Sequence, residues 1–318
     1  MYTHLRRRAG DLAVEGFLRG LSAVARLHPR SRLERHGVER IANVAYLPDG
    51  TVEHRLDVYR PIHRTGPLPV VVYIHGGGFR ILSKDALWIM ALMFARQGYL
   101  VYNINYRLAP SHPFPAAVSD CCAALEWVVE HAVEHGGDPT RLVLAGESAG
   151  ANLATGLTLA CCYRRGEPYA RRIFDLGIAA RAVLPACGIL QVSDPSRPRH
   201  GRRPSGFLAD RFDEIAEDYL RDCDDRVPGR RDLADPVVFL EGRPAPDRPL
   251  PPFFVGVGTA DPLLEDSQRL QVALERLGAR CELRSYEREA HAFQAMVFRP
   301  NARRYWRDAH IFLADALA

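Results

Sequence analysis

Apolar runs of strand length alternate along this chain with stretches of helical periodicity. The clearest run, LPVVVYI at 68–74, ends in a histidine and three glycines, as a buried strand does where it leaves a sheet for a loop. A similar run begins at Tyr99, and residues 116–135 have the pattern of a helix closed by Gly136 and Gly137. Strands that alternate with helices form parallel βαβ units. The sequence therefore predicts an α/β fold with a mostly parallel, doubly wound sheet.

The same patterns predict the other elements. Two short extended runs joined by the turn signal Pro48-Asp49-Gly50 indicate an opening hairpin over 41–61, which brings the sheet to about eight strands. Further strands are predicted at 141–146, 180–190, 251–261 and 281–289, and further helices at 10–27, 151–163, 212–223, 267–278 and 302–316.

The alternation lapses between about 186 and 250, where the chain becomes rich in Pro, Arg and Asp. We expect this insertion, together with the N-terminal helix, to cover the site as a helical cap. No internal repeat or long linker divides the rest of the chain. The predicted organisation is an N-terminal part of the cap at 1–40, a first part of the core at 41–185, a cap insertion at 186–235 and a second part of the core at 236–318.

Composition excludes several classes of protein. The chain is 47% hydrophobic and 25% charged, and its formal charge of +4 comes from scattered arginines, so nucleic acid is not an expected partner. The seven cysteines include no CxxC spacing, which argues against a zinc site or a disulfide framework. The N-terminal arginines precede no uninterrupted apolar signal core, and no apolar run reaches about 18 residues. A cytoplasmic location without a membrane span is expected.

The segment 146–150, GESAG, has the pattern GxSxG between a predicted strand and a predicted helix. A serine on such a sharp turn adopts a strained backbone, and side chains in place of the flanking glycines would collide. The helix that follows directs its amides at developing negative charge. The pattern alone also fits a glycine-rich helix start, but its context predicts Ser148 as a nucleophile.

A second glycine motif, HGGG at 75–78, ends an earlier predicted strand. Bare backbone amides can approach a substrate oxygen closely. The amides of Gly76, Gly77 and Gly78 are therefore candidates for an oxyanion hole, together with the amide of Ala149. We expect His75 to organise this loop and not to exchange protons.

A serine hydroxyl needs a neighbouring base to become a good nucleophile. His291 follows the last predicted strand, and Asp261 follows the strand before it, at the edge where doubly wound sheets place their sites. The order serine, aspartate, histidine is that of the α/β-hydrolases. Glu265 and Asp266 are alternative acids, although carboxylates at an exposed helix N-terminus would explain them more simply.

Other reactive side chains have simpler explanations. His131 and His135 lie four residues apart on a predicted helix, but no third ligand motif accompanies them, and a solvated helix face is expected. The cysteine pairs at 121–122 and 161–162 lie within helical patterns beside Ala and Leu, and we expect them to be buried. No metal or organic cofactor is expected.

Four segments make the chain similar to the hormone-sensitive-lipase family of α/β-hydrolases, also called bacterial family IV esterases. The resemblance implies the same nucleophile, acid, base and oxyanion donors. It also implies a cap formed by N-terminal helices and an insertion after the sixth strand. The four segments are HGGGF at 75–79, YRLAPSHPFPAA at 106–117, GESAGANLA at 146–154, and DPLLEDS at 261–267 with HAF at 291–293.

The chain departs from the family's usual pattern at four positions. Glu147 stands where many members have Asp, Ala151 and Ala292 where they have Gly, and Ser111 where they have Glu. Ala292 bears most directly on the site, because alanine tolerates a positive φ poorly if the turn beside His291 requires one. None of the four removes a reacting group.

These features predict a serine carboxylesterase that hydrolyses short- to medium-chain esters of small molecules through an acyl-enzyme. An amidase, deacylase or lactonase on the same triad remains an alternative, because the nucleophile does not fix the leaving group. A non-catalytic receptor of the same fold is a further alternative. The polar composition of the cap argues against a lipase acting at lipid interfaces, and a homodimer is left open.

Overall fold

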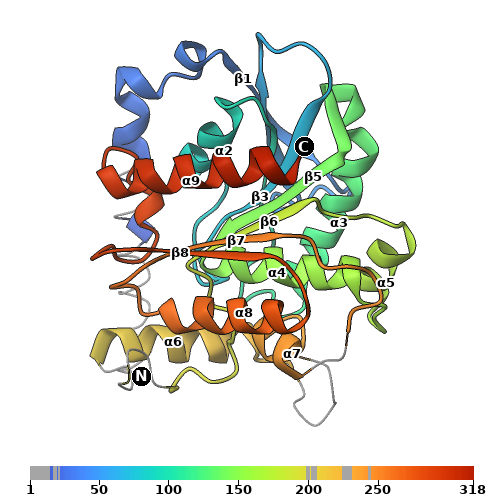
Figure 1. Cartoon of the computed structure of the whole chain (residues 1–318), viewed down its shortest axis with the longest axis vertical. Helices are drawn as coiled ribbons and strands as arrows, with labels where there is room; N and C mark the ends of the chain where they lie inside the picture. The colour runs from blue at the N-terminus through green and yellow to red at the C-terminus, as the bar shows by residue number, and fades with distance from the viewer. Residues whose placement is uncertain are drawn as a thin grey trace.

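The computed structural model describes residues 15–16, 20, 22–197, 201, 206–223, 231–242 and 245–318 (Figure 1). An eight-stranded sheet has the strand order β1-β2-β4-β3-β5-β6-β7-β8. Strand β2 is antiparallel to both of its neighbours, and all pairs from β4 to β8 are parallel. The strands are β1 Val38–Ala45, β2 Arg55–Pro61, β3 Leu68–Ile74, β4 Leu100–Ile104, β5 Gly137–Glu147, β6 Ala182–Ala186, β7 Phe253–Gly258 and β8 Cys281–Tyr286.

Helices cover both faces of the sheet, so the central strands are buried on both sides. Helices α2 and α9 lie on one face, and α3, α4, α5 and α8 lie on the other (Figure 1). Alternate residues of β3 enter different cores: Val70, Val72 and Ile74 pack with the second group of helices, and Val71 and Tyr73 with the first. The helices are α2 Trp88–Ala95, α3 Ala116–His131, α4 Ala149–Cys162, α5 Pro168–Asp175, α6 Gly206–Tyr219, α7 Pro236–Gly242, α8 Leu264–Arg276 and α9 Pro300–Ala316.

The doubly wound sheet, its opening hairpin and the eight strands are confirmed. The helix predicted at 116–135 is α3, extended by a short 3₁₀ turn that ends at Gly136 with φ 85°. Three helices were not predicted. Seven of the eight residues of α2 are buried, so its sequence has no amphipathic period. Helix α5 is short, with only Ala170 and Ile173 buried, and α7 lies beside a proline-rich connection.

The two segments expected to form the cap are described in part. Residues 22–27 are helical, as are residues 15, 16 and 20, whereas the other positions of the predicted helix at 10–27 lie outside the described residues. The helix predicted at 212–223 is present as α6. The predicted insertion at 186–235 includes residues 198–200, 202–205 and 224–230, which also lie outside the described part of the chain.

The seven cysteines are free thiols, and six of them are buried. The pairs at 121–122 and 161–162 lie in α3 and α4, as predicted, and fill the core beneath the sheet. In the described part of the chain, no helix combines the length and the apolar character needed to cross a bilayer.

Candidate active site

Ser148 lies on a sharp turn between strand β5 and helix α4. Its φ of 56° and ψ of −117° are far from ordinary backbone conformations. The flanking glycines leave no room for a side chain. A Cβ on Gly150 would lie 2.0 Å from the carbonyl oxygen of Ile74, and a Cβ on Gly146 would lie 2.5 Å from the backbone of Gly150. The GxSxG spacing is therefore a steric requirement of this turn, which leaves the serine partly exposed.

The glycine loop that follows β3 lies directly beside this turn. A Cβ on Gly76 would lie 2.8 Å from the carbonyl oxygen of Glu147 and 3.2 Å from the Cβ of Ser148. Gly77 and Gly78 have φ values of 118° and 60°, which glycine adopts without strain. The loop thus brings bare backbone against the serine.

His75 organises this loop, as the sequence predicts. The buried ring places Nδ1 2.7 Å from the carbonyl oxygen of Gly76 and stacks on Tyr106 at 4.4 Å between centroids. The Tyr106 hydroxyl donates a hydrogen bond to the carbonyl oxygen of His75. Burial lowers the pKa of His75 to about 4, so the ring is neutral near pH 7 and suited to a structural role.

Glu147 connects the serine turn to the glycine loop, a role that sequence reasoning missed. Its Oε1 accepts a hydrogen bond of 2.6 Å from the amide of Gly76. Burial raises the pKa of this carboxyl group to about 8, so it is mostly protonated near pH 7. Because the amide of Gly76 already has this partner, the candidate oxyanion donors narrow to the amides of Gly77, Gly78 and Ala149.

Asp261 and His291 come from adjacent loops at the carboxyl ends of β7 and β8. Asp261 is fully buried, and its Oδ1 accepts a hydrogen bond of 2.8 Å from the amide of Leu263. Nδ1 of His291 lies 2.9 Å from Oδ2 and 3.2 Å from Oδ1 of Asp261. The end of β7 lies close to the loop after β8, since a Cβ on Gly258 would lie 2.0 Å from the carbonyl oxygen of Glu289.

The His291 side chain is 37% exposed, which gives it access to solvent. Desolvation lowers its pKa, but the negative charge of Asp261 and the hydrogen bond to that carboxylate outweigh this effect, and the net pKa is raised above its usual value. Ala292 has φ 55°, so the turn beside the histidine does require the left-handed conformation that a glycine would adopt more readily.

Cys187 also lies at this edge, directly after β6, and was not singled out in the sequence. The thiol is fully buried. Its sulfur, an oxygen of Asp261 and a nitrogen of His291 all lie within 4.8 Å of one another. Sequence reasoning missed it because the predicted strand ran to residue 190, which placed Cys187 inside the strand, whereas β6 ends at Ala186.

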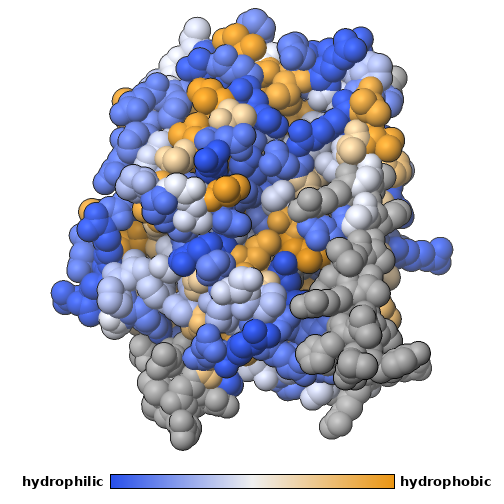
Figure 2. Space-filling model, turned by 180° about the vertical axis from the view of Figure 1, so that it is seen from behind, coloured by the Kyte–Doolittle hydropathy of each residue, from blue (hydrophilic) through white to orange (hydrophobic). Residues whose placement is uncertain are grey.

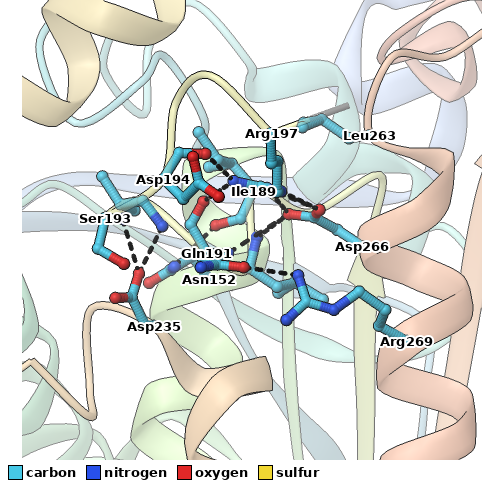
Figure 3. A network of polar contacts seen from close by, with 12 residues as sticks. Asn152, Ile189, Gln191, Ser193, Asp194, Arg197, Asp235, Leu263, Asp266 and Arg269 are labelled. Carbon is cyan, nitrogen blue, oxygen red and sulfur yellow. Dashed lines mark hydrogen bonds and ion pairs between the residues drawn. The ribbon is translucent and has the colours of Figure 1, made fainter. Parts of the chain in front are cut away.

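Asp266, an alternative acid, has a different role. It lies in the first turn of α8, as predicted, but its carboxylate is buried and not exposed. Its Oδ2 lies 2.6 Å from Nη2 of Arg197 and accepts a hydrogen bond of 2.8 Å from the amide of Leu190 (Figure 3). Asp266 therefore anchors the segment that follows β6. The other alternative acid, Glu265, is partly exposed and accepts a hydrogen bond from the amide of Gly201.

Further polar contacts fix the segment after β6 (Figure 3). The side-chain amide of Asn152, from α4, donates to the carbonyl oxygens of Ile189 and Ala234 at 2.7 Å each. Arg269, from α8, donates to Oε1 of Gln191 at 2.6 Å. The chain leaving Cys187 is thus held by both helices that flank the site.

Helix α6 packs on the glycine loop. The ring of Tyr219 stacks on Phe79 with 3.8 Å between centroids. Nη1 of Arg80 lies 2.8 Å from Oε2 of Glu214, and Nε of Arg80 lies 2.7 Å from Oδ2 of Asp218. The helix from the predicted insertion therefore covers the residues that follow the three glycines.

His131 and His135 are not on a solvated helix face, contrary to the sequence prediction. His131 stacks on Trp127 at 4.2 Å, and its Nδ1 lies 2.8 Å from the carbonyl oxygen of the same tryptophan. Nδ1 of His135 lies 3.0 Å from the hydroxyl of Tyr102. Both rings are half-buried in an aromatic cluster, where packing outweighs solvation.

Comparison with known proteins gives the fold and the family of the chain. Residues 71–295 match the family model described as the alpha/beta hydrolase fold. Carboxylesterase NlhH of Mycobacterium tuberculosis is 33% identical over 281 residues, which cover 87% of this chain and 80% of the relative. Esterase LipI of the same species is 28% identical over 233 residues, or 71% of this chain and 65% of that protein.

Solved structures share the fold over nearly the whole chain. Esterase LipW from Mycobacterium marinum aligns with a TM-score of 0.73 and 26% identity, over 96% of this chain and 90% of that one. An inhibited esterase B from Lactobacillus rhamnosis aligns with a TM-score of 0.79 and 19% identity, over 100% and 97% of the two chains. With its fold, its motifs and these relatives in agreement, the chain belongs to the hormone-sensitive-lipase family of α/β-hydrolases and is a serine ester hydrolase.

Proposed function

We propose that this enzyme hydrolyses short- to medium-chain carboxylic esters, with Ser148 as nucleophile, His291 as general base and Asp261 as the acid that orients the histidine. The observation that supports this assignment best is the meeting of three strand ends. The serine follows β5, the aspartate follows β7, and the histidine follows β8 with its Nδ1 2.9 Å from the aspartate. Parallel sheets of this kind gather reacting groups at the carboxyl edge.

The reaction begins when the ester carbonyl oxygen accepts hydrogen bonds from the amides of Gly77, Gly78 and Ala149. Asp261 holds Nδ1 of His291 as the protonated nitrogen, which leaves a lone pair on Nε2. That nitrogen takes the proton from Ser148 as its oxygen attacks. The hydrogen bond between serine and histidine is expected to tighten in the substrate complex, as catalytic hydrogen bonds generally do.

The tetrahedral intermediate collapses as His291 gives its proton to the departing alcohol, leaving the acyl group on Ser148. Water then attacks the acyl-enzyme, the same imidazole accepts the water proton, and the acid is released. The amides stabilise the negative charge that develops in both steps. In similar sites, removal of one such donor lowers kcat by about a hundred- to a thousandfold.

Water-soluble esters fit the surface better than aggregated lipid. The face seen in Figure 2 is largely hydrophilic, with hydrophobic residues in small groups. Enzymes that act at lipid interfaces need a broad apolar patch. Phe207 and Leu208, the exposed apolar pair at the start of α6, do not form one by themselves.

We also propose that residues 1–40 and 186–235 act as the cap over this site. The packing of α6 on the glycine loop, through Arg80 and Phe79, supports this organisation. The side of the cap that faces substrate would then set the acyl-length range, because the triad itself does not select the acyl group.

The test is hydrolysis of p-nitrophenyl esters of increasing acyl length by the wild type, by Ser148→Ala and by Ser119→Ala, a matched change on α3. Loss of the nucleophile should lower kcat by up to about a millionfold, as in other triads, while Ser119→Ala retains full activity. A folded wild type that hydrolyses amides or lactones but no open-chain ester would overturn the choice of substrate class. Undiminished activity in Ser148→Ala would overturn the assignment of the nucleophile.

A further inference from the structure

Three side chains that can bind a metal ion converge at the carboxyl ends of β6, β7 and β8. The sulfur of Cys187, a carboxylate oxygen of Asp261 and a ring nitrogen of His291 lie within 4.8 Å of one another. Aspartate and histidine serve the proposed triad, but ester hydrolysis gives the cysteine no task.

Cys187 is held firmly in this position. It is fully buried with φ 41°, and its amide donates a hydrogen bond of 2.9 Å to the carbonyl oxygen of Gly256. Nε2 of the buried Gln294 lies 3.6 Å from its sulfur and is positioned to donate to it. Outer hydrogen bonds of this kind orient metal ligands and tune their affinity, and an N–H donor favours a thiolate over a thiol.

The donor set selects a class of cation. Thiolate, imidazole and carboxylate are the ligands of zinc and of softer thiophilic ions, whereas Mg²⁺ and Ca²⁺ require oxygen ligands. A tetrahedral zinc ion holds its ligand atoms about 3.3 to 3.8 Å apart, so these three atoms need only a small side-chain movement. The histidine side chain is 37% exposed, so solvent reaches the ring. A water would be the fourth ligand of a tetrahedral ion.

We propose that Cys187, Asp261 and His291 form a binding site for a thiophilic divalent cation such as Zn²⁺, and that occupancy of the site switches the enzyme off. The thiol loses its proton to solvent, and the proton on Nδ1 of the histidine passes to Nε2 as Nδ1 binds the metal. One proton is therefore released for each ion bound. The inhibition, although not the binding, rests on the proposed function, because an imidazole protonated on Nε2 cannot accept a proton from Ser148.

Cadmium is the suitable probe, since a cadmium–thiolate bond has an ultraviolet charge-transfer band. Titration of the wild type with Cd²⁺ should give this band at one equivalent per chain. Ester hydrolysis should be lost over the same range and return on addition of EDTA. Cys187→Ala should abolish both the band and the inhibition. If that variant is too unstable, Cys187→Ser provides the same comparison, because an alcohol oxygen replaces the soft ligand.

Cys281→Ala is the matched control, since Cys281 is the only one of the seven thiols that is not buried. This variant should keep the band and the inhibition; a band that survives Cys187→Ala and disappears in Cys281→Ala would overturn the inference. Ser148→Ala should still bind one cadmium ion with the same band. An inactive wild type that binds cadmium would therefore contradict only the proposed function, and an active wild type without the band would contradict only the metal site.

Discussion

Nδ1 of His291 lies 2.9 Å from Oδ2 of Asp261, and the two residues come from neighbouring loops at the end of the sheet. The carboxylate is fully buried, so its charge acts on the ring with little screening by solvent. A second hydrogen bond, from the amide of Leu263, fixes the orientation of the carboxylate. The carboxylate thereby favours the tautomer of His291 that carries its proton on Nδ1, and its charge raises the pKa of the ring against the effect of desolvation.

Replacement Asp261→Asn should lower kcat by about ten-thousandfold, as the equivalent change does in serine proteases. The amide keeps the shape of the site but can stabilise the wrong tautomer of His291. The measurement is kcat on a p-nitrophenyl ester, together with a circular dichroism spectrum that should match the wild type. Asp266→Asn, at the rejected acid position, should retain far more activity; equal losses would contradict the assignment of Asp261.

Activity should rise with pH through a midpoint above 6.5, the usual pKa of histidine. The base must be neutral to accept a proton, and the charge of Asp261 raises the pKa of His291 despite the opposing effect of desolvation. In Asp261→Asn the charge is gone and the desolvation remains, so the midpoint should move to lower pH. The check is kcat/KM against pH for both proteins, and an unchanged midpoint would refute this electrostatic argument.

Glu147 should make the folded protein less stable as pH rises. The pKa of its carboxyl group is about 8 in the folded protein and near 4.5 in the unfolded chain. At a pH between these two values, the folded protein retains a proton that the unfolded chain has lost. The free energy of unfolding then falls with pH, by at most about 1.4 kcal/mol for each pH unit. The glutamine in Glu147→Gln cannot ionise. The free energy of unfolding of this variant, measured by urea denaturation, should therefore increase relative to that of the wild type between pH 5 and pH 8.

The control for this prediction is Glu134→Gln, because Glu134 is exposed, and its effect on stability should not change over the same range. Glutamine at 147 can still accept the hydrogen bond from Gly76, so activity near pH 7 should remain within a few fold of the wild type. Glu147→Ala removes that acceptor and should lose more activity than Glu147→Gln. Equal activity in the two variants would show that the contact with Gly76 does not position the glycine loop.

The pair Arg197–Asp266 should contribute strongly to stability. The aspartate side chain is 2% exposed and the arginine side chain 10%, so Arg197→Met leaves a buried carboxylate without its counter-ion, at a cost of about 3 kcal/mol or more. The double variant, Arg197→Met with Asp266→Asn, should lose less free energy of unfolding than the two single variants lose together. The comparison is the pair Arg284–Glu282, whose side chains are 57% and 30% exposed and where Arg284→Met should lower the free energy of unfolding by at most about 1 kcal/mol.

Local patterns were sufficient to predict the framework of the fold, and the proposed triad rests on the same patterns. Apolar runs identified the strands, and the glycines around Ser148 were predictable because the turn sterically excludes side chains. The triad then followed from the order in which the reactive residues succeed the strands. Each of these inferences needs only neighbouring residues and the general geometry of a parallel sheet.

Contacts between distant segments were not predictable in this way. Glu147 meets Gly76 across 71 positions, and Asp266 meets Leu190 across 76. The position of Cys187 beside His291 depends on the register of β6, β7 and β8 and on the turn at Ala292. Sequence gives the chemical character of these side chains, but their partners are determined only when the sheet is assembled.

Because the proposed nucleophile follows β5 and the proposed base lies in the loop after β8, we expect a growing chain to remain inactive until β8 has been synthesised. A ribosome-bound intermediate that ends before β8 can contain the serine turn and the glycine loop, yet it has no base with which to activate them. Premature acylation of Ser148 is thereby avoided until the last strand has docked. Ester hydrolysis during translation would consequently report the moment at which the sheet is completed.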